Sequence, residues 1–498
     1  MKHSYRQYCE ELLATTSLQW ITELLNLHTT AEVFVVGGSV RDLMLGRESN
    51  DLDFVVRNVD ESTLETFLSQ QGEINAVGKS FGVFVFKPTG YEGNAFEIAL
   101  PRTEESFNTG KYHDFKIHSD PHLPIEHDLA RRDITINAMA LNIVSGALID
   151  PFGGSSDCEA KIIRTVGDPA IRFGEDYTRM LRAVRFSAQL GFEIDPQTLI
   201  VIQQLSKHIT SMAPERIQQE VNKILTSPHF EHGMNYFKES KLLEVLFPEL
   251  AQGYGVVQGK SHIYDVYTHL MKAASYANQK GYSLEIIMAS LFHDCGKPKT
   301  QKFINGVDTY YQHEYVGEKM VKDALKRYKY PVDFIKKVAH LVRNHMFYYN
   351  QGEVSDAGVR RLIVKVGPEH INDLLRLRMC DRIGMGRPKA KPFKLEELEQ
   401  RVAILLTDPI SPNMIALDGD AMMKLLNIKP SIRLKHLKNA LLAEVLEDPS
   451  KNNIDHQSAR VIELNKLTDE ELIALAPDIE QEEEQRQKDV LKNFKGVK

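Results

Sequence analysis

The sequence predicts an α+β unit followed by a long, mainly α-helical region. Up to about residue 148, short apolar runs such as FVVGG, DFVV, GVFVF, AFEIAL and MALNIV have the composition of buried strands and alternate with helical segments. From Glu175 onward, apolar residues recur at helical spacing and strand signals become rare. With 498 residues the chain is too long for one core, so we expect roughly three or four compact units.

The chain divides into five expected parts. The stretch DPFGG marks the change to helical structure, and the Pro/Lys-rich GRPKAKPFK precedes the last helices. The charged end, IEQEEEQRQKDVLKNFKGVK, is predicted to be solvated or frayed. The expected parts are an N-terminal helical lead-in (1–30), an α+β head (31–165), a helical neck (166–250), a histidine-bearing helical domain (251–390) and a helical tail with a charged C-terminus (391–498).

Composition excludes several classes of protein. The formal net charge of -7 argues against a general polyanion binder, although a local basic face could still bind nucleic acid. No segment resembles a membrane span, and the polar N-terminus lacks the apolar core of a signal peptide, so we expect a cytoplasmic protein without membrane partners. The four scattered cysteines fit reduced thiols better than disulfides or a zinc site.

The stretch VVGGSVRDLMLGRESNDLDFVV, residues 35–56, carries the first chemical signal. Two strands, Val33–Val36 and Phe54–Val56, are predicted to flank a short helix from Val40 to Leu45. Asp51 and Asp53 stand one residue apart at a strand start, so both carboxylates project from the same face. Such a pair favours an oxygen-preferring ion such as Mg2+, shared with substrate phosphates.

On spacing alone, this acid pair is more often an ordinary feature of a strand end, but its neighbours strengthen the metal interpretation. Gly37 and Gly38 supply a turn where backbone can approach a phosphate. In LARRDITINAMAL, Arg131 and Arg132 are suited to triphosphate oxygens, although they could simply be the surface of a helix start. These observations together predict phosphoryl transfer.

A long polar segment interrupts the head between Leu100 and Leu129. It reads PRTEESFNTGKYHDFKIHSDPHLPIEHDL and contains three prolines. A loop of this length inside a compact domain is usually a functional lid or a disordered segment.

The stretch RFGEDYTRMLRAVRF suggests how a base could be selected. Asp176 and Arg179 stand three apart on a predicted helix, where a surface salt bridge is the simpler explanation. Adenine and cytosine, however, each present an amino donor beside an unprotonated ring nitrogen. A fixed carboxylate and a fixed guanidinium would therefore accept A and C and reject G and U.

These motifs together carry a resemblance. The order GGSVRD, DLD, RRDITINAM, DPFGG, EDYTRMLRAVRF and PERIQQEV resembles the bacterial (class II) CCA-adding tRNA nucleotidyltransferases and the related bacterial poly(A) polymerases, through about residue 225. The resemblance implies an α+β, polymerase-β-type nucleotidyltransferase head followed by an all-α neck, body and tail. It also implies a magnesium-dependent enzyme that adds C, C and A to the 3' end of tRNA from CTP and ATP.

The resemblance assigns residues to roles. Asp51 and Asp53 match the catalytic, Mg2+-binding carboxylates, and Asp176 and Arg179 match the pair that selects CTP and ATP. Arg102 and Glu104 open the family's flexible loop, whose full length here disfavours an enzyme that adds only CC. The expected nucleotide-binding set is Gly37, Gly38, Arg41, Asp42, Arg102, Arg132, Asp133, Asn137, Asp176, Arg179 and Arg182. Glu97 in FEIAL could face the metals, but a solvent-facing position on its strand is at least as plausible, so it has no assigned role.

The helical half contains a second candidate site. A lone His-Asp pair is usually structural, but here several histidines and carboxylates could gather in a helical bundle around a divalent metal of unspecified identity. The spacing resembles the HD phosphohydrolase superfamily, and the expected ligands are His269, His293, Asp294, His313, His345 and Asp381. By resemblance they would hydrolyse a phosphate ester or a 2',3'-cyclic phosphate. A domain that only holds tRNA is an open alternative.

Two rival functions follow from the same motifs. A bacterial poly(A) polymerase or an A-adding enzyme shares most head motifs, although the HD body argues against the polymerase. In the second, the protein is a hydrolase: the head is residual and the HD site carries the activity.

The expected partners are tRNA, CTP and ATP. Local Lys and Arg residues would hold the acceptor arm of the tRNA, and a homodimer is possible.

Overall fold

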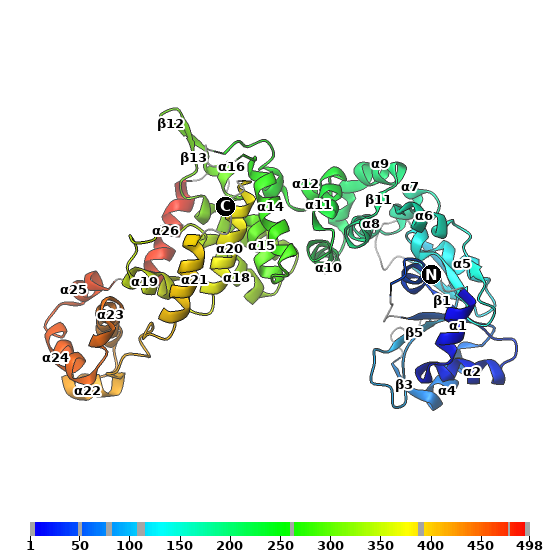
Figure 1. Ribbon diagram of the computed structural model, residues 1–498, viewed down its shortest axis with the longest axis horizontal. Helices are drawn as coiled ribbons and strands as arrows, with labels where there is room; N and C mark the ends of the chain where they lie inside the picture. The colour runs from blue at the N-terminus through cyan, green and yellow to red at the C-terminus, as the bar shows by residue number, and fades with distance from the viewer. Residues whose placement is uncertain are drawn as a thin grey trace. The chain divides into compact units, whose positions relative to one another are not determined.

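The computed structural model describes residues 5–47, 52–75, 82–106, 115–258, 263–386, 393–476 and 479–493. The chain forms two compact units, Met1–Leu246 and Phe247–Lys498 (Figure 1). Among the described helices, none combines the length and the apolar character needed to cross a membrane. The four cysteines are buried and free.

A seven-stranded mixed sheet forms the centre of the first unit, in the order β3-β4-β5-β2-β1-β8-β9. The predicted strands at 33–36 and 54–56 are confirmed. Strand β2 pairs antiparallel with β1 and in parallel with β5. The strands are β1 (Glu32–Val36), β2 (Asp53–Arg57), β3 (Gly72–Asn75), β4 (Val83–Pro88), β5 (Phe96–Ala99), β8 (Ala140–Asn142) and β9 (Leu148–Ile149).

Apolar burial fixes this sheet. The central residues of β1 and β2 are almost completely buried, which explains the continuous apolar runs of the sequence. Trp20 packs edge-on against Phe54 and Phe86. The helices of the head are α1 (Tyr5–Leu13), α2 (Gln19–Leu27), α3 (Gly38–Met44), α4 (Glu61–Gln71), α5 (Ile125–Ala130) and α6 (Gly154–Ala160), with short 3-10 turns at Thr16–Leu18 and Thr135–Asn137. The short helix predicted from Val40 begins two residues earlier.

The polar segment after Leu100 is more ordered than predicted. Strands β6 (Arg102–Ser106) and β7 (Phe115–Ser119) pair antiparallel, with Arg102 opposite Ser119, and helix α5 follows. The prediction of one long irregular loop was therefore wrong for the described parts. The strands are rich in polar residues, and β6 lacks the apolar alternation by which strands are recognised, so the sequence pattern did not predict the hairpin.

Helices α7 to α12 complete the first unit, and the predicted continuous helix around Asp176 is broken there. Helix α7 begins after Asp168, whose side chain accepts hydrogen bonds from the first-turn amides. Asp176 adopts an extended conformation (φ -151°) between α7 and α8, so it does not share a helix with Arg179 as predicted. The helices are α7 (Pro169–Glu175), α8 (Thr178–Leu190), α9 (Pro196–Leu205), α10 (Pro214–Leu225), α11 (Phe230–Glu239) and α12 (Leu242–Leu246). A 3-10 helix at Ser206–Ser211 and the short parallel pair β10 (Ile162–Ile163) and β11 (Glu193–Ile194) join them.

The second unit is a helical bundle with one small hairpin. Its first part consists of α13 (Pro248–Ala251), α14 (Val266–Gln279), α15 (Leu284–Phe292), α16 (Lys297–Thr300), β12 (Lys302–Ile304), β13 (Val307–Thr309), α17 (His313–Arg327), α18 (Val332–Asn344), α19 (Asp356–Val366) and α20 (Ile371–Gly384). Its second part consists of α21 (Phe393–Leu405), α22 (Gly419–Leu426), α23 (Ile432–Glu447), a 3-10 turn (Pro449–Lys451), α24 (Ile454–Leu464), α25 (Asp469–Leu475) and α26 (Ile479–Asn493).

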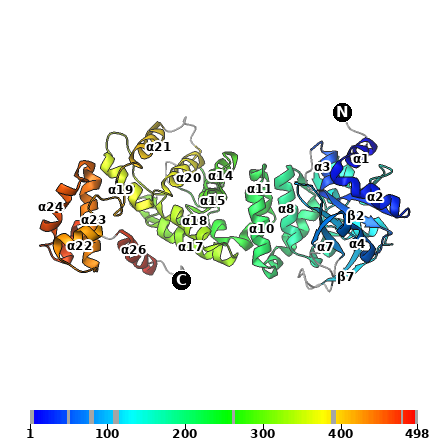
Figure 2. The same ribbon diagram turned by 90° about the horizontal axis from the view of Figure 1, so that it is seen from below.

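The last helix is docked, which corrects the prediction of a solvated or frayed end for this part of the tail. Helix α26 lies beside α17 (Figure 2). Val490 is buried, and the Arg486 guanidinium lies 5.6 Å from the ring centroid of Tyr315 on α17. Among the side chains of α26 that the structure describes, Val490 is the buried apolar one in a highly charged sequence, so composition alone did not reveal the contact.

Candidate functional site

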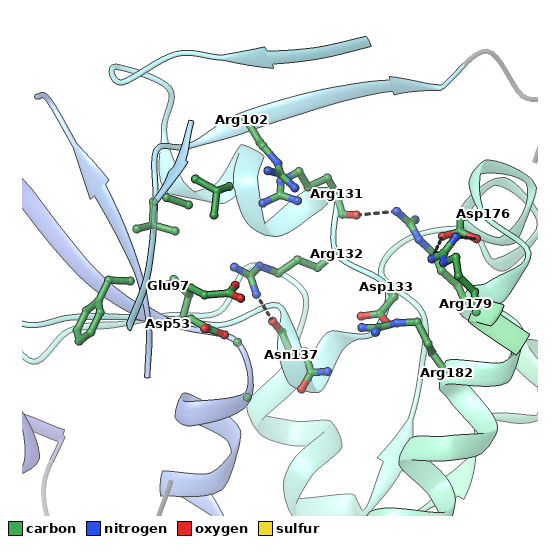
Figure 3. Close-up of a pocket in the computed structure, with 18 residues that line it drawn as sticks. Asp53, Glu97, Arg102, Arg131, Arg132, Asp133, Asn137, Asp176, Arg179 and Arg182 are labelled. Atoms are coloured by element: carbon green, nitrogen blue, oxygen red, sulfur yellow. Dashed lines mark hydrogen bonds and ion pairs between the residues drawn. The ribbon is translucent and has the colours of Figure 1, made fainter. Parts of the chain in front are cut away.

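A cavity of about 710 Å3 opens where β1, β2 and β5 meet the segment after α5 and the start of α8 (Figure 3). It brings together most of the predicted head residues. The lining residues are Val36, Gly37, Gly38, Asp53, Phe54, Val55, Val83, Glu97, Ala99, Arg102, Arg131, Arg132, Asp133, Asn137, Asp176, Arg179, Arg182 and Arg216. Two predicted residues, Arg41 and Asp42, are not among the described residues that line it, and Asp51 lies outside the described residues.

Two carboxylates stand next to each other on one wall of the cavity. Asp53 begins β2, and the parallel register places it opposite Glu97 of β5. Figure 3 shows both side chains close together and facing Arg132. Sequence reasoning leaves Glu97 unassigned between a metal-facing and a solvent-facing position, and the sheet order now places it beside Asp53. Paired carboxylates that line a cavity together with several arginines are suited to a divalent cation such as Mg2+.

Gly37 shapes the turn that borders the cavity. Its φ of +73° is a conformation that favours glycine, and an added Cβ would lie 2.8 Å from Nη1 of Arg132. The glycine therefore lets Arg132 cross close to the backbone after β1. Nη1 of Arg132 also donates to the backbone oxygen of Asn137 at 3.3 Å.

Arg41 and Asp42 do not line the cavity themselves but hold a residue that does. Arg41 donates from Nε and Nη2 to the two carboxylate oxygens of Asp42, each at 2.9 Å. Nη1 of Arg41 donates to Oδ1 of Asn137 at 2.7 Å. These contacts fix the orientation of Asn137, which does line the cavity.

Six arginines form the remaining wall of the cavity, here called the arginine wall. They come from β6, from the segment after α5, from α8 and from α10, and they are Arg102, Arg131, Arg132, Arg179, Arg182 and Arg216. Guanidinium groups form charge-assisted, often bidentate bonds with phosphate oxygens. The cavity thus combines a cation-binding acid pair with a polyphosphate-binding surface.

Asp176 and Arg179 both reach the cavity, each held by its own partners. Oδ1 of Asp176 accepts from the amide and hydroxyl of Thr178 at 2.9 and 2.6 Å, and Oδ2 accepts from Arg216 at 2.9 Å. Arg179 donates to Glu175 at 2.5 Å and to the backbone oxygen of Arg131 at 3.2 Å. A carboxylate and a guanidinium are therefore fixed side by side although they form no ion pair with each other among the described contacts.

Arg182 and Asp133 both line the cavity and form an ion pair. Nε of Arg182 lies 2.5 Å from Oδ2 of Asp133. Burial favours the neutral form of Asp133, but Arg182 outweighs this effect and lowers the pKa of Asp133 to about 2. The pair joins the segment after α5 to α8.

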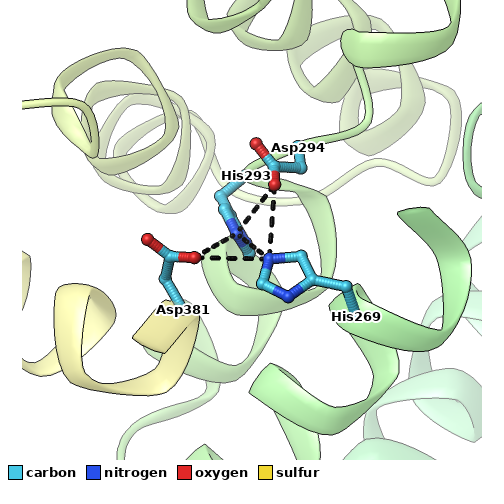
Figure 4. A group of neighbouring side chains, drawn as sticks. All are labelled: His269, His293, Asp294 and Asp381. Carbon is cyan, nitrogen blue, oxygen red and sulfur yellow. Dashed lines mark hydrogen bonds and ion pairs between the residues drawn. The ribbon is translucent and has the colours of Figure 1, made fainter. Parts of the chain in front are cut away.

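The second predicted site also assembles. All six predicted side chains are buried. Nε2 of His269 lies 2.9 Å from Nε2 of His293 and 3.3 Å from both Asp294 and Asp381 (Figure 4). Oδ1 of Asp294 lies 3.1 Å from Nε2 of His313 and 3.5 Å from Nε2 of His345. Asp294 thus belongs to two groups of possible ligands, one with His269, His293 and Asp381 and one with His313 and His345.

The backbone aims three of these histidines inward. Nδ1 of His293, His313 and His345 lies within 2.9 Å of the backbone oxygen three residues earlier. When Nδ1 carries the proton, Nε2 is left as the ligand atom. Buried imidazoles and carboxylates that converge in this way fit a divalent metal.

Two of these histidines have pKa values shifted in opposite directions. Burial favours neutral His269, but hydrogen bonds to Asp294 and Asp381 outweigh it and raise the pKa of His269 to about 9. Burial dominates at His345 and lowers its pKa to about 4.

Fold and geometry together define the class: a nucleotidyltransferase head with a helical neck, joined to an HD-type helical unit. Three family models match the chain, in the same order as the head, the neck and the HD-type unit. They are "Poly A polymerase head domain" over residues 33–164, "Probable RNA and SrmB- binding site of polymerase A" over residues 191–253 and "HD domain" over residues 261–381.

Similar proteins identify the family. A multifunctional CCA protein of Xanthomonas campestris pv. campestris is 32% identical over 401 residues, which cover 78% of this chain and 93% of the relative. One from Neisseria gonorrhoeae is 33% identical over 370 residues, covering 73% and 86%. The chain therefore belongs to the family of multifunctional CCA proteins, and the predicted membership of the CCA-adding nucleotidyltransferases is confirmed.

Solved structures support the fold. The Bacillus stearothermophilus CCA-adding enzyme in complex with CTP matches with a TM-score of 0.65 at 22% identity, covering 94% of this chain and 98% of that one. The Thermotoga maritima CCA-adding enzyme with tRNA matches with a TM-score of 0.54 at 19% identity, covering 91% and 98%. The predicted fold class is thereby confirmed, while the roles of individual residues stay predictions.

Proposed function

We propose that this chain adds C, C and A to the 3' end of tRNA, using CTP and ATP and no nucleic-acid template. One observation carries the proposal: Asp176 and Arg179 are fixed in the same cavity as the Asp53–Glu97 pair and the arginine wall. A base-reading pair, a phosphate-binding surface and a cation-binding acid pair are thus available to one bound nucleotide. Family membership favours this function over the poly(A) polymerase alternative.

The arginine wall would hold the triphosphate. Arg102 on β6 and Arg131 and Arg132 after α5 present guanidinium groups toward the cavity, with Arg132 beside the two carboxylates (Figure 3). Binding in this orientation places the α-phosphate near Asp53 and Glu97 and lets pyrophosphate leave among the arginines. Magnesium bound by Asp53 and Glu97, and by Asp51 as predicted from sequence, would supply positive charge at the reacting phosphate.

Asp176 and Arg179 would read the base. The Asp176 carboxylate accepts a hydrogen bond from the exocyclic amino group of cytosine or adenine, and Arg179 donates to the neighbouring ring nitrogen. Guanine and uracil would leave both groups without a correct partner, a mismatch that discriminates strongly in a buried site. The sequence of the added nucleotides is then supplied by the protein. The tRNA 3'-hydroxyl attacks the α-phosphate in line, and a new phosphodiester bond replaces the bond to pyrophosphate.

Incorporation by variants tests this function. Purified protein is incubated with Mg2+, labelled CTP and ATP, and a tRNA transcript that ends at the discriminator base. We expect the wild type to extend the transcript and Asp53→Asn to abolish extension. Asp60→Asn is a matched control, because Asp60 is an exposed acid that follows the same strand and does not line the cavity. Extension by Asp53→Asn at the wild-type rate would contradict the assignment.

For the second unit we propose a metal-dependent phosphohydrolase centre. The convergence of six buried ligand groups, with Asp294 shared between two sets, favours a working site over a domain that only holds tRNA. The centre would take one or two divalent metals, which supply charge neutralisation for a phosphate monoester or a 2',3'-cyclic phosphate. Hydrolysis by the wild type that is lost in Asp294→Asn supports this activity. Hydrolysis retained together with a complete lack of nucleotide addition by the wild type would instead favour the residual-head alternative.

A further inference from the structure

A buried carboxylate behind the arginine wall is used by neither proposed activity. Asp128 lies on α5 and its side chain is 0% exposed. Its Oδ1 lies 2.9 Å from Nε and 2.8 Å from Nη2 of Arg131, and its Oδ2 lies 3.4 Å from Nη2 of Arg132. The backbone N–H of Arg102 also donates to Oδ1, at 3.3 Å.

The three partners of Asp128 share one property. Arg102, Arg131 and Arg132 all line the cavity, whereas Asp128 does not. Arg102 is the first residue of β6, and the two other arginines follow α5 directly, so Asp128 joins two separate segments of the wall. The carboxylate acts entirely through these neighbours, because it is closed off from anything that binds in the cavity.

Electrostatics explains why a carboxylate is needed here. Adjacent guanidinium groups repel each other and have many rotamers, so an empty phosphate-binding surface tends to spread. One buried negative charge between them offsets the repulsion and fixes their direction. Burial opposes ionisation of Asp128, but Arg131 and Arg132 lower its pKa, so the carboxylate is charged at neutral pH.

We propose that Asp128 is a positioning residue for the triphosphate subsite, holding Arg131, Arg132 and the start of β6 in the arrangement that binds the phosphates of CTP and ATP. This inference rests on the proposed nucleotide addition. It implies that Asp128 acts on phosphate binding and leaves base selection near wild type. Its side chain makes no described contact with Asp176 or Arg179, and the described bond of Arg179 to this segment goes to the backbone oxygen of Arg131, not to the guanidinium that Asp128 holds.

Asp128→Asn, compared with Asp195→Asn, tests the inference. Asp195 is a matched control in the same unit: it is also largely buried and paired with an arginine, Arg164 at 2.6 Å, and asparagine can still cap α9. Comparing CTP with CMP, which lacks the β- and γ-phosphates, separates an effect on phosphate binding from a general disturbance of the cavity. Affinities for CTP and for CMP are measured with Mg2+ by competition against a fluorescent CTP analogue, and KM and kcat are measured for CTP and ATP.

The expected result is a selective loss. Asp128→Asn lowers CTP affinity and raises KM for CTP and ATP by about tenfold, while CMP affinity, kcat and the preference for CTP over UTP stay near wild type. Asp195→Asn leaves all of these near wild type. A folded Asp128→Asn protein with wild-type CTP affinity, or with CTP and CMP weakened equally, overturns the inference.

Two further measurements keep the outcome decisive. If Asp128→Asn does not fold, Asp128→Glu replaces it: the charge is kept but the carboxylate is displaced by one methylene, and the same selective loss for CTP is expected. Equal CTP and CMP behaviour in that variant overturns the inference. If the wild type adds no nucleotide, the proposed function fails, whereas the binding comparison still decides the role of Asp128.

Discussion

Asp53 and Glu97 face each other in register on the parallel strands β2 and β5, and both line the same cavity. This relationship depends on the sheet order, in which β5 inserts beside β2 although some forty residues separate them in the chain. It makes Glu97, which the sequence left unassigned, a candidate for the catalytic acid set.

We expect Glu97→Gln to lower kcat for nucleotide addition by about 100-fold, because loss of one carboxylate weakens cation binding where charge develops. The matched control is Glu73→Gln, since Glu73 is an exposed acid on β3 of the same sheet. Steady-state incorporation of CTP into tRNA measures both. Wild-type kcat in Glu97→Gln would show that this side chain is only part of the cavity wall.

Arg216 is expected to act through Asp176, which it contacts at 2.9 Å. Without this partner Oδ2 of Asp176 loses its described guanidinium contact, and Thr178 alone holds Oδ1, so Arg216→Gln should reduce the preference for CTP over UTP by about tenfold. The ratio of kcat/KM for the two nucleotides is the measurement. Lys223→Gln, on the exposed side of the same helix, removes the same charge and should leave the ratio unchanged.

Local patterns predicted what short segments can encode. The apolar runs at 33–36 and 54–56 identified buried strands, and the histidine and aspartate motifs identified the six residues that gather in the second unit. Contacts between distant segments escaped this reasoning. Arg216 lies forty residues from Asp176, and although it belongs to PERIQQEV, one of the motifs of the resemblance, that motif does not indicate the pairing with Asp176. The β6–β7 hairpin and the docked α26 were missed because polar composition outweighed the few residues that anchor them.

The Asp133–Arg182 pair should make the first unit sensitive to acid. The pKa of Asp133 is lowered to about 2, so its stabilisation is fully present above the ordinary aspartate pKa and is lost as pH falls through about 2. At pH 7, Asp133→Asn should lower the free energy of unfolding by about 2 kcal/mol, and the difference should fall by about half at pH 3. Urea denaturation followed by fluorescence of the single tryptophan, Trp20, reports on this unit. A difference that does not depend on pH would contradict the assignment.

Metal binding to the second unit should release a proton. His269 has a pKa of about 9 without metal and must lose its proton to become a ligand, whereas His345, with a pKa of about 4, is already neutral. Calorimetric titration of the metal-free protein with Mn2+ at pH 7.5, in buffers of different ionisation enthalpy, gives the number of protons released. We expect His269→Gln to lower that number and His345→Gln to weaken binding without lowering it. Identical proton release in wild type and His269→Gln would contradict this account.

The most direct test of the central claim is product analysis at single-nucleotide resolution on tRNA that lacks its 3' end. The account predicts two added residues with CTP alone, three with CTP and ATP together, and no extension with UTP or GTP. It also predicts that Asp176→Ala loses this order while retaining some transfer. A long adenosine tail with ATP alone and no use of CTP would contradict the account and assign the chain to the poly(A) polymerases.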